Sequence, residues 1–346
     1  MAPLNGQRKY DAILVAGEGK SSYKVHRQNK AFLTINGKCL IHYIVNALQK
    51  VESVKDIYIV GQKEKLDQVF LSERIDMESP KRIHIIEQRS NLYENVWHTF
   101  LQSLKDEYGE VPNTDTHRDR AVLIVPCDAP LITPREVEHF ISTADMENYD
   151  HVLGMVSREK LKHFYPQEKK QGIKMAYLHI KEDSFRVNNL HLVKPLRIEN
   201  REYIQKMYQY RYQRNFKNLV LLGLSLFGKD EIRHYKHYIG LQLCLFFASL
   251  KLDFLVDYFR KLNPKTELEK IISTIMKTRF MALEVPYPGA ALDIDNAKDY
   301  EAMKIRFDDW WEYLQEYKES PPIPNNYNEV PPTASTENVA RPSHTH

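Results

Sequence analysis

The chain has 346 residues, of which 42% are apolar and 27% are charged, and its formal net charge is +3. This composition is ordinary for a chain that folds around a hydrophobic core, and the small net charge argues against a general nucleic-acid binder. Three widely spaced cysteines, Cys39, Cys127 and Cys244, argue against a thiolate zinc site and fit a reducing compartment. We therefore expect a cytoplasmic protein, and the polar N-terminus carries no pattern of a signal peptide.

Strand and helix patterns alternate through the first half of the chain. The predicted strands are residues 12–15, 56–60, 82–87, 121–125 and 150–156, and the predicted helices are 40–50, 65–70, 92–104 and 134–144. Such alternation, with continuous apolar strands, indicates an α/β fold in which a mostly parallel sheet lies between helices. Ligands bind beyond the carboxyl ends of the strands in these sheets, so the loops after 12–15 and 121–125 should meet at one edge.

The second half of the chain has a different pattern. Residues 158–174 are charged and predict a loop, whereas residues 199–280 predict a helical insertion beside the sheet. Within the insertion, Gly240–Phe259 has helical apolar spacing that predicts a packed amphipathic helix, with contact to a membrane surface as the alternative. Its apolar run is too short to span a bilayer. Residues 319–346 predict a disordered tail, which leaves residues 1–318 as the expected folded domain.

The first predicted strand leads directly into a small loop with the sequence Ala16-Gly17-Glu18-Gly19-Lys20-Ser21. Glycines let the backbone approach an anion, and the N–H groups of such a loop can point at it. The P-loop pattern requires a glycine where Leu14 stands, and the dinucleotide fingerprint requires one where Ser22 stands, so neither motif is present. A plain turn between a strand and a helix is the alternative for this segment.

This loop is followed by Lys30-Ala31-Phe32-Leu33 and by Gly37-Lys38-Cys39-Leu40-Ile41. The series resembles the opening signature of the nucleotidyltransferase family that includes molybdenum-cofactor guanylyltransferase-like and sugar-phosphate nucleotidyltransferase enzymes. The resemblance implies a Rossmann-like fold of glycosyltransferase-A type with a mixed sheet. It also implies that Ala16, Gly17, Gly19 and Lys20 wrap the triphosphate of an NTP and that Lys30 meets its phosphates. The sequence departs from the signature at Glu18, and the usual loop arginine is absent.

Two further segments carry aspartates that resemble motifs of the same family. Asp128 follows the strand 121–125 in Cys127-Asp128-Ala129-Pro130-Leu131, where a carboxylate is well placed to hold Mg²⁺. The resemblance makes Asp128 a metal ligand and makes Asp295, in Ala291-Leu292-Asp293-Ile294-Asp295, the residue that completes the site. In a strand, Asp293 and Asp295 would point to the same side. A solvated turn that caps a helix is the alternative for the second segment.

Two asparagines lie in segments with weaker resemblance. Ser90–Val96 resembles the segment that flanks the nucleobase pocket, which implies a nucleotide contact for Asn95, although Ser90 also predicts a helix N-cap. Arg186–Leu192 resembles a segment from one branch of the family, which implies that Asn189 lines the acceptor pocket. A turn followed by an edge strand is the alternative for this segment.

Together these motifs predict a Mg²⁺-dependent nucleotidyltransferase. It would transfer NMP from an NTP to a phosphorylated acceptor, such as a sugar phosphate, and release pyrophosphate, with Lys30 and Asp128 as the catalytic residues. Neither nucleic acid nor a transmembrane segment is expected. Two alternatives stay open, namely a glycosyltransferase that uses a nucleotide sugar and a non-catalytic nucleotide-binding protein, the latter suggested by Glu18 and the missing arginine.

Overall fold

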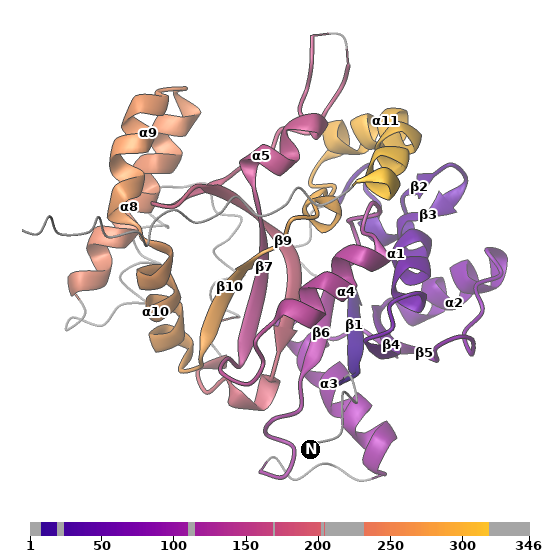
Figure 1. Cartoon of the computed structure of the whole chain (residues 1–346). Helices are drawn as coiled ribbons and strands as arrows, with labels where there is room; N and C mark the ends of the chain where they lie inside the picture. The colour runs from indigo at the N-terminus through magenta and orange to yellow at the C-terminus, as the bar shows by residue number, and fades with distance from the viewer. Residues whose placement is uncertain are drawn as a thin grey trace, which may run out of the picture.

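The computed structural model describes residues 8–18, 24–109, 115–168, 170–201, 204 and 232–317. A mixed sheet lies at its centre (Figure 1). The strands run in the order β10-β7-β9-β6-β1-β4-β5, and β8 pairs with β9 outside this path. Their bounds are β1 Tyr10–Ala16, β4 Val54–Gly61, β5 Ile83–Glu87, β6 Val122–Pro126, β7 His151–Ser157, β8 Leu178–His179, β9 Ser184–Val193 and β10 Phe280–Glu284.

The sheet is mostly parallel, as the sequence predicts. Strand β1 pairs in parallel with β4 and β6, β4 with β5, and β10 with β7. Strand β9 is the exception, because it lies between β6 and β7 and runs antiparallel to both. The edge-strand alternative for Arg186–Leu192 is therefore wrong. The alternation of buried and half-buried residues along β9 fits a central antiparallel strand equally well.

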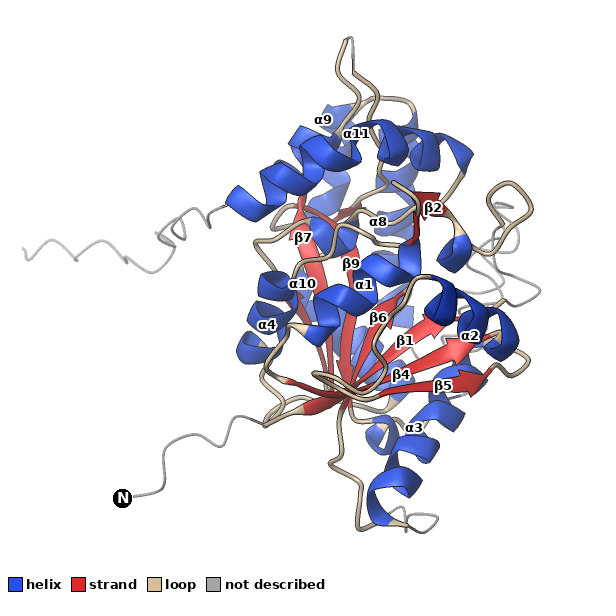
Figure 2. Ribbon diagram, turned by 90° about the vertical axis from the view of Figure 1, so that its right-hand side faces the viewer, coloured by secondary structure: helices blue, strands red, loops and turns tan. Residues whose placement is uncertain are grey.

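Helices cover both faces of the sheet. Successive residues of β1 point to opposite faces, so they belong to two different cores. Ala12 and Leu14 belong to the core under α1, α2 and α4, and Ile13 belongs to the core under α3. Figure 2 shows α3 on the opposite side of the sheet from α1 and α2. The helix bounds are α1 Leu40–Gln49, α2 Lys63–Ser72, α3 Leu92–Tyr108 and α4 Pro134–Thr143.

One predicted loop contains a short helix. Residues 158–174 begin with α5 (Arg158–Leu161) and the 3-10 helix η2 (Lys162–Phe164). Leu161 and Phe164 are fully buried, so two apolar residues three positions apart anchor this turn despite the charged sequence around them.

The helical character predicted for the insertion holds for its described part, residues 232–276, which forms α8 (Ile232–Ser249), α9 (Asp253–Phe259) and α10 (Lys265–Met276). The single helix predicted at Gly240–Phe259 is wrong, because the chain breaks at Lys251, which has a φ of 59°. Leu250 and Phe254 flank the break and are 52% and 69% exposed, so this run is packed only in part. Among the described residues, no helix has the length and apolar character needed to cross a membrane.

The last described helix, α11 (Ala297–Glu316), returns to the N-terminal part of the chain. Figure 1 shows α11 close to α1 and to the small hairpin of β2 (Thr34–Ile35) and β3 (Lys38–Cys39). Met303 and Phe307 of this helix belong to the same buried cluster as Leu33 and Ile35. The Tyr300 hydroxyl also donates to the Thr34 carbonyl at 2.7 Å. This packing brings the segment before α11 to the edge of the sheet that follows β1 and β6. The predicted tail at 319–346 lies outside the described residues.

Candidate functional site

Lys30 follows the loop after β1 and lies close to the end of that strand. It begins the 3-10 helix η1 (Lys30–Phe32), which is capped by the Asn29 side chain. The Asn29 amide also donates to the Ala16 carbonyl at 2.9 Å, so the start of η1 is tied to the end of β1. The Lys30 Nζ lies 2.8 Å from Asp128 Oδ2 and 3.5 Å from Asp295 Oδ1. Three residues that the sequence singles out separately therefore converge on one point.

Asp295 reaches this point on a loop, not on a strand. The segment between the 3-10 helix η5 (Gly289–Ala291) and α11 has no strand pairing, so the expectation of a strand at Asp293 and Asp295 is wrong. A single backbone bond, from the Ile294 N–H to the Asp128 carbonyl at 3.0 Å, joins it to the loop after β6. The Asn296 side chain then caps α11, which fixes the end of the segment.

Arg186 of β9 joins the two aspartates and was assigned no role from the sequence. Its Nη2 lies 2.6 Å from Asp293 Oδ1 and 3.6 Å from Asp295 Oδ2, and its Nε donates to the Ala291 carbonyl at 2.8 Å. Asp293 and Asp295 thus face the same cation, although the backbone between them is irregular. The only hint in the sequence is that Arg186 opens the segment that contains Asn189.

The charges in this cluster influence each other. Burial lowers the pKa of Lys30, but Asp128 and then Asp295 outweigh it, and the pKa of the ammonium lies above its ordinary value. Burial raises the pKa of Asp293 to about 6, against the opposing effect of Arg186. Lys30 therefore stays charged at neutral pH and can neutralise an anionic ligand.

The loop after β1 is described as far as Glu18, and again from Lys24. Predicted residues Gly19 and Lys20 fall outside the described residues, whereas Ala16 is the buried last residue of β1. Glu18 forms an ion pair with Lys24 and accepts a hydrogen bond from Gln62 Nε2 at 2.8 Å. Its negative charge, the main departure from the family signature, is thus balanced within the protein.

Asn95 holds the start of this loop from the side of α3. It is 5% exposed, and its Oδ1 accepts a hydrogen bond from the Arg89 N–H at 2.5 Å. A Cβ at Gly17 would overlap the Asn95 amide nitrogen, so the two residues are in close contact. Asn95 therefore lines the cavity and supports the loop from which Gly17 faces it.

Asn189 is turned into the cavity by an irregularity of β9. Between its pairs with Met155 and Leu153, β9 has two more residues than β7. Asn189 adopts a left-handed conformation there, with a φ of 59°, and the Asn188 side chain packs over Gly154, where any Cβ would overlap it. Asn188 Oδ1 also accepts from the Leu190 N–H at 3.1 Å. Such bulges commonly redirect side chains near functional sites.

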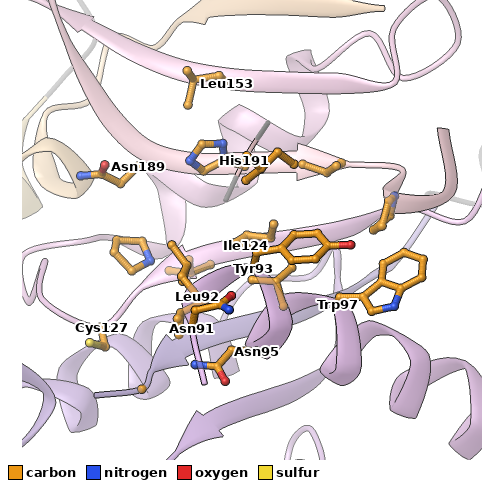
Figure 3. A pocket seen from close by; sticks show the side chains of 18 of the residues that line it. Asn91, Leu92, Tyr93, Asn95, Trp97, Ile124, Cys127, Leu153, Asn189 and His191 are labelled. Carbon is orange, nitrogen blue, oxygen red and sulfur yellow. The ribbon is translucent and has the colours of Figure 1, made fainter. Parts of the chain in front are cut away.

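A cavity of about 680 Å³ connects these groups. It lies on the α3 side of the sheet, and Figure 3 shows residues of α3 below those of β7 and β9. Its charged edge, which we call the rim, consists of Lys30, Asp128, Asp293 and Asp295. A cavity of this size, mostly apolar with a few convergent polar groups, is typical of a small-molecule site.

The cavity also contains two histidines that the sequence did not reveal. His151 of β7 and His191 of β9 lie with their ring nitrogens 3.0 Å apart. They are 40 positions apart in the chain, without metal-ligand spacing, and only the antiparallel pairing of β7 with β9 brings them together. Burial, and then the neighbouring His191, lowers the pKa of His151 well below its usual value, so His151 is neutral at physiological pH.

An open α/β sheet that carries a glycine-containing loop, a lysine and aspartates at the carboxyl ends of its strands defines a class of nucleotide-binding domain. Comparison with family models identifies it further. Residues 12–165 match the model of the MobA-like NTP transferase domain. The family resemblance inferred from the sequence is thus confirmed, and the domain is one that uses an NTP for a transfer reaction in general terms.

Comparison with solved structures gives one likeness that supports the fold. A hypothetical transferase from Thermus thermophilus has 20% identity and a TM-score of 0.54, with 84% of this chain and 99% of that chain covered. A CMP:2-keto-3-deoxy-manno-octonic acid synthetase complexed with CTP has 11% identity and a TM-score of 0.43, with 87% and 99% covered. No curated protein matches the chain. The first of these likenesses shows the Rossmann-like mixed sheet and nothing finer.

Proposed function

We propose that this protein transfers NMP from an NTP to a phosphorylated acceptor. An oxygen of the acceptor's phosphate attacks the α-phosphorus, a new P–O–P bond forms, and the bond between the α-phosphorus and the bridging oxygen breaks. Pyrophosphate leaves with that electron pair. This reaction asks for positioning and charge neutralisation rather than for covalent catalysis by the protein.

The observation that carries the proposal is the convergence of Lys30, Asp128 and Asp295 beside the loop after β1. The Lys30 ammonium is held within 2.8 Å of Asp128 by a 3-10 helix whose cap is bonded to Ala16. A cation fixed in this way can bind the phosphates of the NTP and stabilise the charge that develops on the leaving pyrophosphate. We assign Gly19 and Lys20, which lie outside the described residues, to the same phosphates.

The acidic residues at the rim fit Mg²⁺. The carboxylates of Asp128 and Asp295 both contact Lys30, so their oxygens lie close together. Among the described residues, no group of three or more His, Cys, Asp or Glu side chains is arranged to hold a metal ion, so a metal here would need ligands from the substrate or from water. Two carboxylates are the protein contribution that Mg²⁺ commonly takes, with substrate phosphates and water as its other ligands. Mg²⁺ bound there would offset negative charge at the reacting phosphates.

Asn95 and Asn189 define the two sides of the site. Asn95 supports the loop beside the first turns of α3, and we assign this side to the nucleotide. Asn189 lies across the cavity on β9, and we assign that side to the acceptor. Cys39, Cys127 and Cys244 are all free thiols, which supports our proposal of a cytoplasmic enzyme. We also propose that residues 1–318 form one domain.

The proposal is tested by incubating the full chain with each NTP, with Mg²⁺ and with a panel of sugar and polyol phosphates, while pyrophosphate is measured. We expect release with one NTP only when an acceptor is present. Lys30→Met should lower the rate of this release by about 10²–10³. Lys38→Met, which changes an exposed lysine nearby, should leave it unchanged. Absence of release for every pair, despite NTP binding, would favour the non-catalytic alternative. Release of a nucleotide from a nucleotide sugar would favour a glycosyltransferase.

A further inference from the structure

The cavity extends beyond the rim into a region that the proposed reaction does not use. We call this region the apolar chamber. Its walls come from β7, the end of β9 and the segment after it, α10 and the start of β10. They consist of Leu153, Val193, Ile198, Ile272, Met276 and Phe280. Val193, Ile198 and Met276 also form a buried cluster with Ile272. The chamber is therefore part of the folded core, opened on one side to the cavity.

The chamber extends away from the charged groups along β9. Arg186, near the start of β9, contacts Asp293 of the rim, and Val193 lies three residues beyond the end of the bulge at Leu190. At ~3.3 Å per residue, this places the far wall roughly 10 Å further along the strand. A sugar or a short polyol would leave this length of apolar wall uncovered.

Polar groups in the chamber are few and mostly satisfied within the protein. The Arg201 guanidinium stacks on the Trp97 ring, 4.1 Å from its centre, and His151 is paired with His191. The exception is His151 Nδ1, which is buried and has no hydrogen-bond partner among the described residues. That atom has almost no accessible surface, so it presents no bonding group to a ligand in the chamber.

The nucleobase is a poorer occupant of the chamber than an apolar group. A base carries several donors and acceptors along its edge, and the amides that could meet them, Asn91 and Asn95, lie at the α3 side of the cavity. The chamber instead offers aliphatic and aromatic carbon on the β9 side, beyond Asn189. The acceptor is therefore the substrate whose body the chamber faces.

We propose that the acceptor is an amphiphilic phosphate monoester or phosphonate, with its phosphate at the rim and an alkyl or aryl body in the apolar chamber. This proposal about the acceptor rests on the proposed function in one respect, namely that the reacting phosphate lies at the rim. Apolar area that enters the chamber leaves water, which contributes about fourfold in affinity for each buried methylene.

Binding of alkyl phosphates tests this inference without any need for turnover. Dissociation constants of butyl, hexyl and octyl phosphate for the full chain are measured by isothermal titration calorimetry, with glycerol 3-phosphate as the polar reference. We expect affinity to rise with chain length, by about fourfold per methylene, until the chamber is filled. Equal affinity of octyl phosphate and glycerol 3-phosphate would overturn the inference.

A substitution on α10 locates the binding of the alkyl body. Ile272 is half-buried and lines the chamber from the helix side, so Ile272→Trp should fill it and abolish the dependence on chain length. Thr274→Trp changes an exposed residue on the same helix, and that variant should keep the dependence. NTP affinity should be the same in both variants, which also shows that both fold. Dependence on chain length that survives Ile272→Trp would contradict the assignment.

The two proposals fail in different ways. Pyrophosphate release with polar acceptors, combined with alkyl phosphates that bind no better than glycerol 3-phosphate, would keep the proposed function and overturn the amphiphilic acceptor. Alkyl phosphate binding that depends on chain length, with that dependence lost in Ile272→Trp, would support the chamber as the site of the alkyl body. If no NTP yields pyrophosphate in the same protein, only the proposed function is overturned.

Discussion

Gly17 is the position where a single methyl group should damage the site most directly. In Gly17→Ala the new Cβ would overlap Asn95 Nδ2 and would lie 3.4 Å from Gln88 Oε1. Asn95 is 5% exposed and its Oδ1 is bonded to the Arg89 N–H, so it cannot move without losing that bond. Overpacking costs about 1–3 kcal/mol, and a buried amide left without its partner costs about the same. We therefore expect a loss of about 2 kcal/mol in stability.

A double-mutant cycle with Asn95→Ala separates this clash from other effects of the substitution. Asn95→Ala removes the atom with which the new methyl group collides, so Gly17→Ala should cost about 1 kcal/mol less in that background. The free energy of unfolding of the four proteins is measured by urea denaturation, and NTP affinity is measured by calorimetry. Costs that add within about 0.5 kcal/mol would refute the close contact between Gly17 and Asn95 on which the reasoning depends.

Three further predictions concern charged residues. Lys30→Met should lower the turnover number by about 10²–10³, because it removes a positioned cation, while Lys38→Met should not; steady-state assays check this. Arg186→Met leaves Asp293 buried without its partner and should lower the free energy of unfolding by about 3 kcal/mol, measured with urea. Burial raises the pKa of Glu136 well above its usual value, so the folded protein holds this proton more tightly than the unfolded chain does. Stability should therefore fall as the pH rises from about 4.3 toward the folded pKa, by up to about 1.4 kcal/mol per pH unit, and Glu136→Gln should remove this contribution. Identical pH slopes for Glu136→Gln and the wild type would contradict the last prediction.

Local sequence patterns predict the elements of the first half of the chain because each strand contains a short run of mostly apolar residues and each helix has one apolar face. The strand expected at 121–125 is β6, and the helix expected at 134–144 is α4, which Thr133 caps as its side chain accepts from the Glu136 N–H at 3.2 Å. The central place of β9 could not be predicted in this way. It depends on pairing between segments that are distant in the chain, and a half-buried alternation suits an edge or a central antiparallel strand.

The same distinction between local patterns and distant contacts applies to the residues of the candidate site. Lys30, Asp128 and Asp295 can be singled out from the sequence because each lies in a motif with its own local signature, and the structure brings them together. Arg186 and His151 were missed because their roles depend on contacts across the sheet, with Asp293 in one case and with His191 in the other. Neither contact leaves a recognisable spacing in the sequence.

The central claim is that the rim joins NMP to a phosphorylated acceptor, and ³¹P NMR of the reaction mixture tests it most directly. We expect one pyrophosphate for each NTP consumed, a new pair of coupled phosphoanhydride resonances, and loss of both in Asp128→Asn. Resonances of inorganic phosphate or free nucleotide in place of the coupled pair would contradict it, as would an unchanged rate in Asp128→Asn.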